Sequence, residues 1–339
     1  MSVLIRTAGA IGRITLDRPE ALNALTHDMV RRIDAALDGW ERDPAVTAVV
    51  LDGAGERGLC AGGDIRAIRE SALGDRSRAL AFWRDEYRLN ARIARLGVPW
   101  VALMDGIVMG GGVGLSAHGR VRIVTERSRV AMPEVGIGFV PDVGGTYLLG
   151  RAPGELGTHL ALTADAMGAA DAVLCGFADH VVPSERLPEL VAALTAGTPA
   201  PEAAAALAVP AGEAGLSRHR DWIDHCYAAD TVEEIVDRLS SYGEPAAKEA
   251  AGRILGHSPT SVKVTLAALR RAKALDTLEE VLEQEWRVSS AALAGPDLAE
   301  GVRAQVVDKD RSPRWSPGTL AEVGEAAVTA HFAPAGPLF

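Results

Sequence analysis

Short β-prone runs and amphipathic segments alternate through the first part of the chain. Val3–Thr7 and Ile11–Leu16 flank a turn that contains Gly9, so this region predicts a β-hairpin. Thr26 is placed to cap a helix, because the apolar positions after it recur at helical spacing, at Met29, Ile33, Leu37 and Trp40. Further apolar runs predict buried strands at Ala45–Leu51, Trp100–Met104, Val121–Val124 and Val130–Met132. Strands that alternate with helices in this way are typical of an α/β domain.

The pattern changes after residue 194. Thr195 to Gly215 is rich in alanine, proline and glycine, which favours a loosely ordered connection, with a helix at Glu202–Ala208 as the alternative. Beyond it, helical periodicity predicts helices over Val232–Leu239, Val262–Ala272, Leu278–Leu293 and Leu298–Val307. We therefore expect an active-site core over residues 1–194, the connection over 195–215 and a helical region over 216–339. The helices of that last region are expected to serve packing or contacts in a homo-oligomer.

The composition narrows the classes of protein to consider. The chain has 339 residues, and its 48% hydrophobic and 24% charged residues are ordinary for a globular protein. A formal net charge of −10 argues against a general nucleic-acid binder, which would need a basic face. The three cysteines form no C-x-x-C pair, so we expect a reducing compartment, no structural disulfide and no metal site; they are Cys60, Cys175 and Cys226.

We expect neither a targeting segment nor a membrane span. Met1 leads directly into the first β-prone run, without the anatomy of a signal peptide. The most apolar stretch, Val98 to Ala117, is interrupted by Asp105 and by several glycines. A buried strand followed by the start of a helix explains such a stretch better than a membrane span. These features predict a cytoplasmic protein that binds neither nucleic acid nor membrane.

Two glycine-rich segments are candidates for binding a reacting oxygen atom. One runs from Leu59 through Gly62-Gly63-Asp64 to Arg66, and the other is Met109 to Leu115, with the glycines Gly110-Gly111-Gly112. Glycine lets the backbone approach a ligand closely, and the first N–H groups of a helix lack partners within it. Two such loops that converge could direct two N–H donors at one oxyanion. Tight turns alone also explain each loop taken singly.

Two carboxylates lie among glycine, proline and apolar residues, which suits acid–base chemistry. They are Glu134, after Met132-Pro133, and Asp142, after Pro141. Apolar surroundings disfavour the charged form and raise the pKa of a carboxyl group toward the range where it can exchange protons. The alternative is structural: Glu134 caps a turn, and Asp142 caps a helix that begins near Gly144.

Taken together and in this order, these segments resemble the crotonase superfamily of acyl-CoA enzymes. The resemblance implies an α/β fold, a spiral of ββα turns followed by a C-terminal helical region. It also implies that the two oxyanion-hole donors are the backbone N–H groups of Gly63 and Gly111. Hydratases of this superfamily carry a glutamate two residues beyond G-G-G and a second one twenty residues later. Here the second is Glu134 but the first position is Gly114, which disfavours the addition of water to an alkene.

Further segments resemble the branch of 3-hydroxyisobutyryl-CoA hydrolases. They are Gly58–Arg66, Asp85–Asn90, Met132–Glu134, Pro141–Gly145, Ser258–Ser261, Glu300–Ala304 and Asp308–Trp315. The resemblance implies that Glu86, Gly111, Glu134 and Asp142 contact the substrate, and that Glu134 and Asp142 are catalytic. For Glu86 the alternative is a solvated helix charge that pairs with a neighbouring arginine.

The activity implied is hydrolysis of a 3-hydroxyacyl-CoA thioester in valine breakdown, with coenzyme A as part of the substrate and no metal or redox cofactor. Glu134 would activate a water molecule or attack the carbonyl itself to give a mixed anhydride. Two other functions remain open from the sequence: an enoyl-CoA isomerase or hydratase-like lyase that uses Glu134 alone, and a non-catalytic acyl-CoA-binding protein. The acyl group and the side chains that bind the CoA phosphates stay undetermined.

Overall fold

The computed structural model describes residues 2–339, so Met1, the first residue of the expected core over residues 1–194, lies outside the described residues. These residues form two compact units that interleave along the sequence. Unit 1 contains residues 2–64, 85–131 and 167–215, and unit 2 contains residues 65–84, 132–166 and 216–339. The expected division into a core, a connection and a helical region, with boundaries at residues 194 and 215, stays a prediction.

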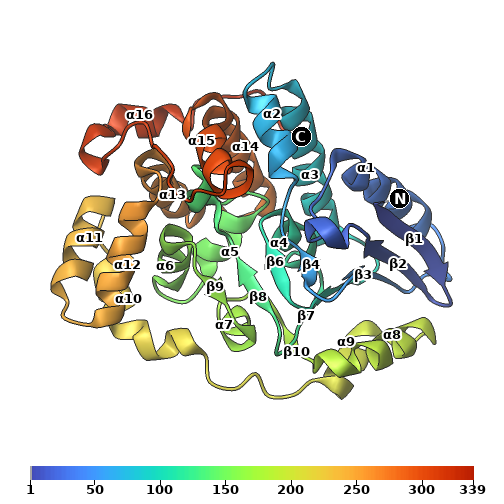
Figure 1. Cartoon of the computed structure of the whole chain (residues 1–339). Helices are drawn as coiled ribbons and strands as arrows, with labels where there is room; N and C mark the ends of the chain where they lie inside the picture. Colours follow the sequence, from blue (N-terminus) through green and yellow to red (C-terminus); the bar gives the residue numbers. More distant parts are fainter. Residues whose placement is uncertain (1) are drawn as a thin grey trace. The chain divides into compact units, whose positions relative to one another are not determined.

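Unit 1 is built on a six-stranded sheet with the strand order β1-β2-β3-β5-β7-β10 (Figure 1). Its strands are β1 (Val3–Ala8), β2 (Ile11–Leu16), β3 (Ala48–Gly53), β5 (Trp100–Met104), β7 (Val121–Val124) and β10 (His180–Val181). The pair β1–β2 is antiparallel, which confirms the predicted hairpin, and the other pairs are parallel. A second, parallel set contains β4 (Gly58–Cys60), β6 (Ile107–Met109) and β8 (Arg129–Ala131). The two-residue strand β9 (Ala166–Met167) follows later in the chain.

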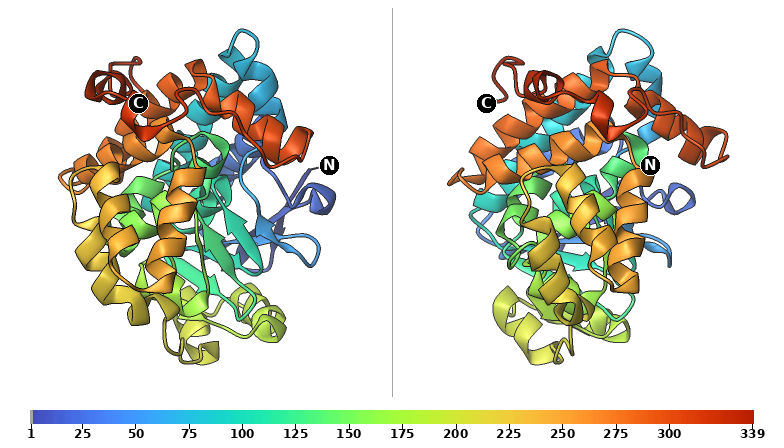
Figure 2. Two further views of the ribbon diagram at one scale, coloured as in Figure 1. Left: turned by 60° about the vertical axis from the view of Figure 1, so that its left-hand side comes forward. Right: turned by 90° about the vertical axis from the view of Figure 1, so that its left-hand side faces the viewer.

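Helices pack on both faces of the large sheet. Those of unit 1 are η1 (Pro19–Ala21), α1 (His27–Trp40), α4 (Gly111–Ser116), α7 (Ala169–Leu174), η3 (Ser184–Arg186), α8 (Leu187–Thr195) and α9 (Ala200–Leu207), with the second half of α3 (Ser77–Arg95). Thr26 caps α1 as predicted, since its hydroxyl accepts a hydrogen bond from the Met29 N–H at 3.3 Å. Trp40 of this helix packs so closely on Gly12 that a methyl group there would overlap the indole ring. Helices α8 and α9 (yellow-green in Figure 2) lie along the face of the sheet opposite to α1.

Two elements of unit 1 differ from the pattern-based expectation. The segment expected to be a loosely ordered connection contains α9, close to the alternative helix at Glu202–Ala208. Its residues Ala200, Ala203, Ala204 and Leu207 are buried in the core cluster beneath the sheet, so packing at helical spacing orders it. The apolar runs also did not predict β4, which pairs with β6 through Gly58 and Cys60. So short a strand has no periodicity of its own.

Unit 2 is mainly helical. The short 3₁₀-helix η4 (Gly215–His219) begins at the last residue of unit 1 and continues into unit 2. The other elements of unit 2 are α2 (Ile65–Ala72), the first half of α3, η2 (Glu134–Ile137), α5 (Gly145–Arg151), α6 (Leu156–Thr163), α10 (Arg220–Tyr227), α11 (Val232–Ser241), α12 (Pro245–Gly256), α13 (Pro259–Ala272), α14 (Leu278–Ala294), α15 (Asp297–Val302), the π-helix η5 (Arg303–Val307), η6 (Leu320–Glu322) and α16 (Glu325–Ala330). The four helices predicted beyond residue 215 are confirmed as α11, α13, α14 and α15, the last continued by the π-helix. Across residues 2–339, no helix is both long and apolar enough to span a membrane.

Candidate functional site

The two glycine-rich segments meet in unit 1. Gly62-Gly63 is held against Leu25, whose N–H donates to the Gly62 carbonyl at 2.8 Å. Gly111 is the first residue of α4, where a backbone N–H has no partner inside the helix. A methyl group built on Gly111 would lie 3.5 Å from the Gly63 nitrogen, and one built on Gly62 would lie 3.6 Å from the Gly111 nitrogen. The backbone nitrogens of Gly63 and Gly111 are thus brought together, as an oxyanion hole requires.

Glycine is required at the turns that bring these nitrogens together. Gly62 and Gly110 have φ angles of 102° and 48°, a region that residues with a Cβ rarely adopt.

Cys60, beside the first loop, is a packing residue, because burial raises the pKa of its thiol to about 12. The neutral thiol is a poor nucleophile at physiological pH.

Glu86 lies against Gly111 and is not a solvated helix charge. Its side chain, on α3, is only 2% exposed. A methyl group added to Gly111 would overlap Glu86 Oε1, and Leu25 Cδ1 would lie 3.1 Å from the same methyl. Unit 1 therefore brings together three of the residues expected at the site, Gly63, Gly111 and Glu86.

Unit 2 carries the other two expected residues, Glu134 and Asp142, in buried positions. Glu134 begins the 3₁₀-helix η2 and is 6% exposed. Its Oε2 atom is buried, and no group within residues 2–339 forms a hydrogen bond with it. Burial raises the pKa of Glu134 well above 4.5, and the nearby charges of Asp142 and Glu285 raise it further. Such a carboxylate is suited to accepting a proton or attacking a carbonyl.

A third carboxylate, Glu285 of α14, joins this cluster and was not predicted as a site residue. Its oxygens accept hydrogen bonds from the Gly144 N–H at 2.6 Å and the Thr146 N–H at 2.9 Å, at the start of α5. Glu285 therefore caps the start of this helix through its side chain. The sequence signal for Glu285 was a charge on the buried face of α14, in register with Leu278 and Leu282.

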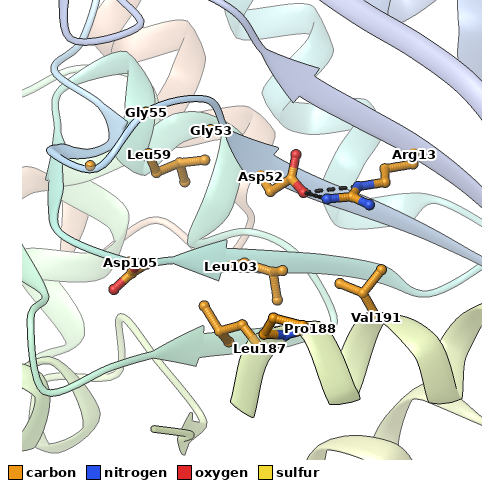
Figure 3. A pocket seen from close by; sticks show the side chains of 11 residues that line it. Arg13, Asp52, Gly53, Gly55, Leu59, Leu103, Asp105, Leu187, Pro188 and Val191 are labelled. Atoms are coloured by element: carbon orange, nitrogen blue, oxygen red, sulfur yellow. Dashed lines mark hydrogen bonds and ion pairs between the residues drawn. The ribbon is translucent and has the colours of Figure 1, made fainter. Parts of the chain in front are cut away.

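A separate cavity of about 310 Å³ in unit 1 contains none of the expected site residues (Figure 3). It lies where β3 and β5 end, beside the start of α8. Arg13 and Asp52 line it and form an ion pair, with Arg13 Nε 2.9 Å from Asp52 Oδ2. A search of residues 2–339 finds no cluster of three His, Cys, Asp or Glu side chains that could hold a metal ion.

Comparison with known proteins gives relatives along almost the whole chain. The human protein named 3-hydroxyisobutyryl-CoA hydrolase, mitochondrial, is 44% identical over 98% of this chain and 89% of the relative. The Danio rerio protein of the same name is 43% identical, over 96% of this chain and 88% of the relative.

Solved structures confirm the expected crotonase-like fold. A crystal structure of a carnitinyl-CoA dehydratase from Mycobacterium thermoresistibile is 53% identical and superimposes with a TM-score of 0.96, covering 99% of this chain and 97% of that one. A crystal structure of an enoyl-CoA hydratase from Rhodobacter sphaeroides is 46% identical, with a TM-score of 0.93 and coverage of 100% and 99%. The sequence profile described as Enoyl-CoA hydratase/isomerase matches residues 11–332. The chain therefore belongs to the enoyl-CoA hydratase/isomerase family, within the crotonase superfamily.

Proposed function

We propose that this chain hydrolyses 3-hydroxyisobutyryl-CoA to 3-hydroxyisobutyrate and coenzyme A, a reaction of valine breakdown. The observation that carries the proposal is Glu134, a buried carboxylate whose Oε2 receives no hydrogen bond from the described part of the chain. The relatives named as hydrolases of this thioester support the choice of substrate. Gly114, at the position of a hydratase glutamate, removes one partner of the acid–base pair that hydration uses.

In this mechanism the thioester oxygen accepts hydrogen bonds from the N–H groups of Gly63 and Gly111. Negative charge develops on that oxygen as the carbonyl becomes tetrahedral, so donors already in place stabilise the transition state more than the ground state. Each well-placed donor is worth about 3 kcal/mol. The approach of the two backbone nitrogens supports this assignment.

Glu134 supplies the reactive carboxylate by one of two routes. As a general base it takes a proton from water, and the resulting hydroxide attacks the carbonyl. As a nucleophile it attacks the thioester carbonyl, and the thiolate leaves as the mixed anhydride forms; water then opens the anhydride and restores the carboxylate. Asp142 hydrogen-bonds the 3-hydroxyl group or directs a proton to the leaving thiolate, and Glu86 supports the acyl pocket beside Gly111. Neither route needs a metal or a redox cofactor.

A lyase is the second candidate, because solved relatives carry the names of a dehydratase and a hydratase. A single carboxylate such as Glu134 could also move a proton in an enoyl-CoA isomerase. A third candidate is an acyl-CoA-binding protein without turnover. Only hydrolysis releases a free thiol from the acyl-CoA, so the product separates the three candidates.

The test is to incubate the purified chain with a panel of acyl-CoA thioesters and to measure free thiol. We expect release from 3-hydroxyisobutyryl-CoA, and Glu134→Gln should lower kcat by at least about 10²-fold with an unchanged circular dichroism spectrum. Binding without thiol release would support the non-catalytic candidate, and conversion without thiol release would support the lyase. A folded Glu134→Gln protein with wild-type turnover would exclude Glu134 as the reactive group.

We also propose a cytoplasmic location and a homo-oligomer formed through the C-terminal helices. The absence of a membrane-spanning helix within residues 2–339 is compatible with this location, although the vertebrate relatives are named as mitochondrial. Fractionation of the source cells tests the location, and light scattering of the purified chain tests the oligomeric state. A monomer at all concentrations would contradict the second proposal.

A further inference from the structure

Glu285 is buried to 1% exposure, yet both of its carboxylate oxygens accept hydrogen bonds. Oε2 accepts from the Gly144 N–H at 2.6 Å. Oε1 accepts from the Thr146 N–H at 2.9 Å and from the Thr146 hydroxyl at 2.6 Å. These donors belong to a turn that is 139 or more residues away in the sequence. One side chain of α14 thus holds the start of α5.

The turn that Glu285 holds directly follows Asp142. Val143 has a φ of 53°, a left-handed conformation that a β-branched residue rarely adopts, and Gly144 follows with a φ of 78°. Gly144 occupies the N-cap position of α5 and has no side chain with which to cap the helix. Glu285 supplies the missing acceptor, and the Asp142 carbonyl accepts from the Gly145 N–H at 2.6 Å. The backbone that carries Asp142 is therefore fixed from α14.

The same turn also contacts the segment that carries Glu134. A methyl group added to Gly145 would lie 2.5 Å from Met132 Cε, so the start of α5 packs tightly on a side chain two residues before Glu134. The charges of Glu285 and Asp142 both act on Glu134. A shift of the turn would consequently disturb the placement of both proposed catalytic carboxylates.

We propose that Glu285 is a positioning residue for the reaction, which fixes the turn from Asp142 to Thr146 and thereby the places of Asp142 and Glu134. This inference rests on the proposed thioester hydrolysis. It assigns Glu285 no contact with the substrate, so its loss should lower kcat more than it changes KM. A role in helix capping alone would lower the stability of the fold and leave kcat per folded molecule unchanged.

The test compares Glu285→Gln with a matched control on the same helix. Glutamine keeps the shape but places an NH₂ donor where one carboxylate oxygen accepted hydrogen bonds from the turn. The control is Gln284→Met, because Gln284 is also buried and donates one hydrogen bond, from Nε2 to the Ala268 carbonyl at 3.0 Å. Both variants lose buried hydrogen bonding on α14, and only one touches the turn. Free-thiol release, measured above pH 8 where Glu285 is ionised, gives kcat and KM, and circular dichroism and thermal unfolding give the folded fraction.

We expect kcat of Glu285→Gln to fall by about 10²-fold, the typical cost of misplacing a reacting group by about 1 Å, while Gln284→Met turns over like the wild type. Wild-type kcat in folded Glu285→Gln overturns the inference, and so does an equal loss of kcat in both variants. If Glu285→Gln does not fold, Thr146→Val is the test variant, because it removes the hydrogen bond from the Thr146 hydroxyl to Glu285. Wild-type kcat in that variant overturns the inference. A wild-type chain that releases no thiol overturns the proposed function and this inference with it.

Discussion

Gly111→Ala tests the packing of Glu86 against the proposed oxyanion loop with a single methyl group. That methyl would overlap Glu86 Oε1 and lie 3.1 Å from Leu25 Cδ1. Gly111 has no positive φ, so alanine suits its backbone and the N–H donor remains. The effect must therefore come from space rather than from backbone strain or a lost hydrogen bond.

The magnitude follows from how far Glu86 has to move. Its oxygen must withdraw by about 1 Å to reach ordinary van der Waals distance from the new methyl. A displacement of about 1 Å at a reacting centre costs about 10²-fold in rate, or about 2.7 kcal/mol of transition-state stabilisation. Because Glu86 is buried, overpacking should also lower the free energy of unfolding, by about 1–3 kcal/mol.

The assay is kcat/KM for release of free thiol, with urea unfolding measured on the same preparations. Gly39→Ala is the matched control, since Gly39 lies in helix α1 and a methyl there would meet nothing within 4 Å. It should keep wild-type turnover and gain up to about 1 kcal/mol of stability from helix propensity. Gly111→Ala with wild-type kcat/KM would refute the view that Glu86 and Gly111 pack together where the thioester reacts.

Three further variants test single interactions. Asp142→Ala should narrow the gap in kcat/KM between 3-hydroxyisobutyryl-CoA and isobutyryl-CoA, since a site that bonds a hydroxyl group rejects the analogue without it; equal slowing of both substrates would instead assign Asp142 to the leaving thiolate. Burial raises the pKa of Glu285 from 4.5 to about 8, so the folded protein holds a proton that the unfolded chain releases in this range. The unfolding free energy contributed by Glu285 is therefore fully present below 4.5 and falls as pH rises toward about 8. Glu285→Gln should flatten that slope in urea unfolding at several pH values, and an unchanged slope would contradict the assignment. Asn90→Leu should raise the melting temperature, because both polar side-chain atoms of Asn90 are buried without a hydrogen-bond partner in residues 2–339. Each such atom typically costs about 1–3 kcal/mol of stability. A lower melting temperature would show that the Asn90 amide is hydrogen-bonded in solution.

The elements that could be predicted are those whose signals lie within a few residues of each other. Thr26 is three residues from the N–H that it caps, and the hairpin strands β1 and β2 adjoin one turn. Strand β4 and helix α9 were harder, because each is ordered mainly by residues from distant segments. A three-residue strand has no period to detect, and an alanine-rich helix looks like a linker until the surface that it covers is known.

The candidate site divides in the same way. Gly63 and Gly111 were predicted through the resemblance of their glycine-rich motifs to the crotonase superfamily. Such motifs are local, as the positive φ of Gly62 and Gly110 shows. For Glu86 the sequence left two interpretations, since whether a helix carboxylate is buried depends on what packs against it. Glu285 was not predicted at all. Its partners lie 139 and 141 residues away, and no local pattern encodes that distance.

Hydrogen bonding separates the roles of two carboxylates that share an apolar environment in unit 2. A buried carboxylate costs free energy unless hydrogen bonds replace its water shell. Glu285 has three donors, which counteract part of the effect of burial on its pKa and fix its position. Glu134 Oε2 receives no hydrogen bond from the described residues, and burial disfavours the charged form of Glu134, so its pKa is raised. A carboxylate in that state gains most by bonding to a proton or to an electrophilic carbon, which is the property that thioester hydrolysis requires. The difference in donors therefore supports the proposed roles, positioning for Glu285 and reactivity for Glu134.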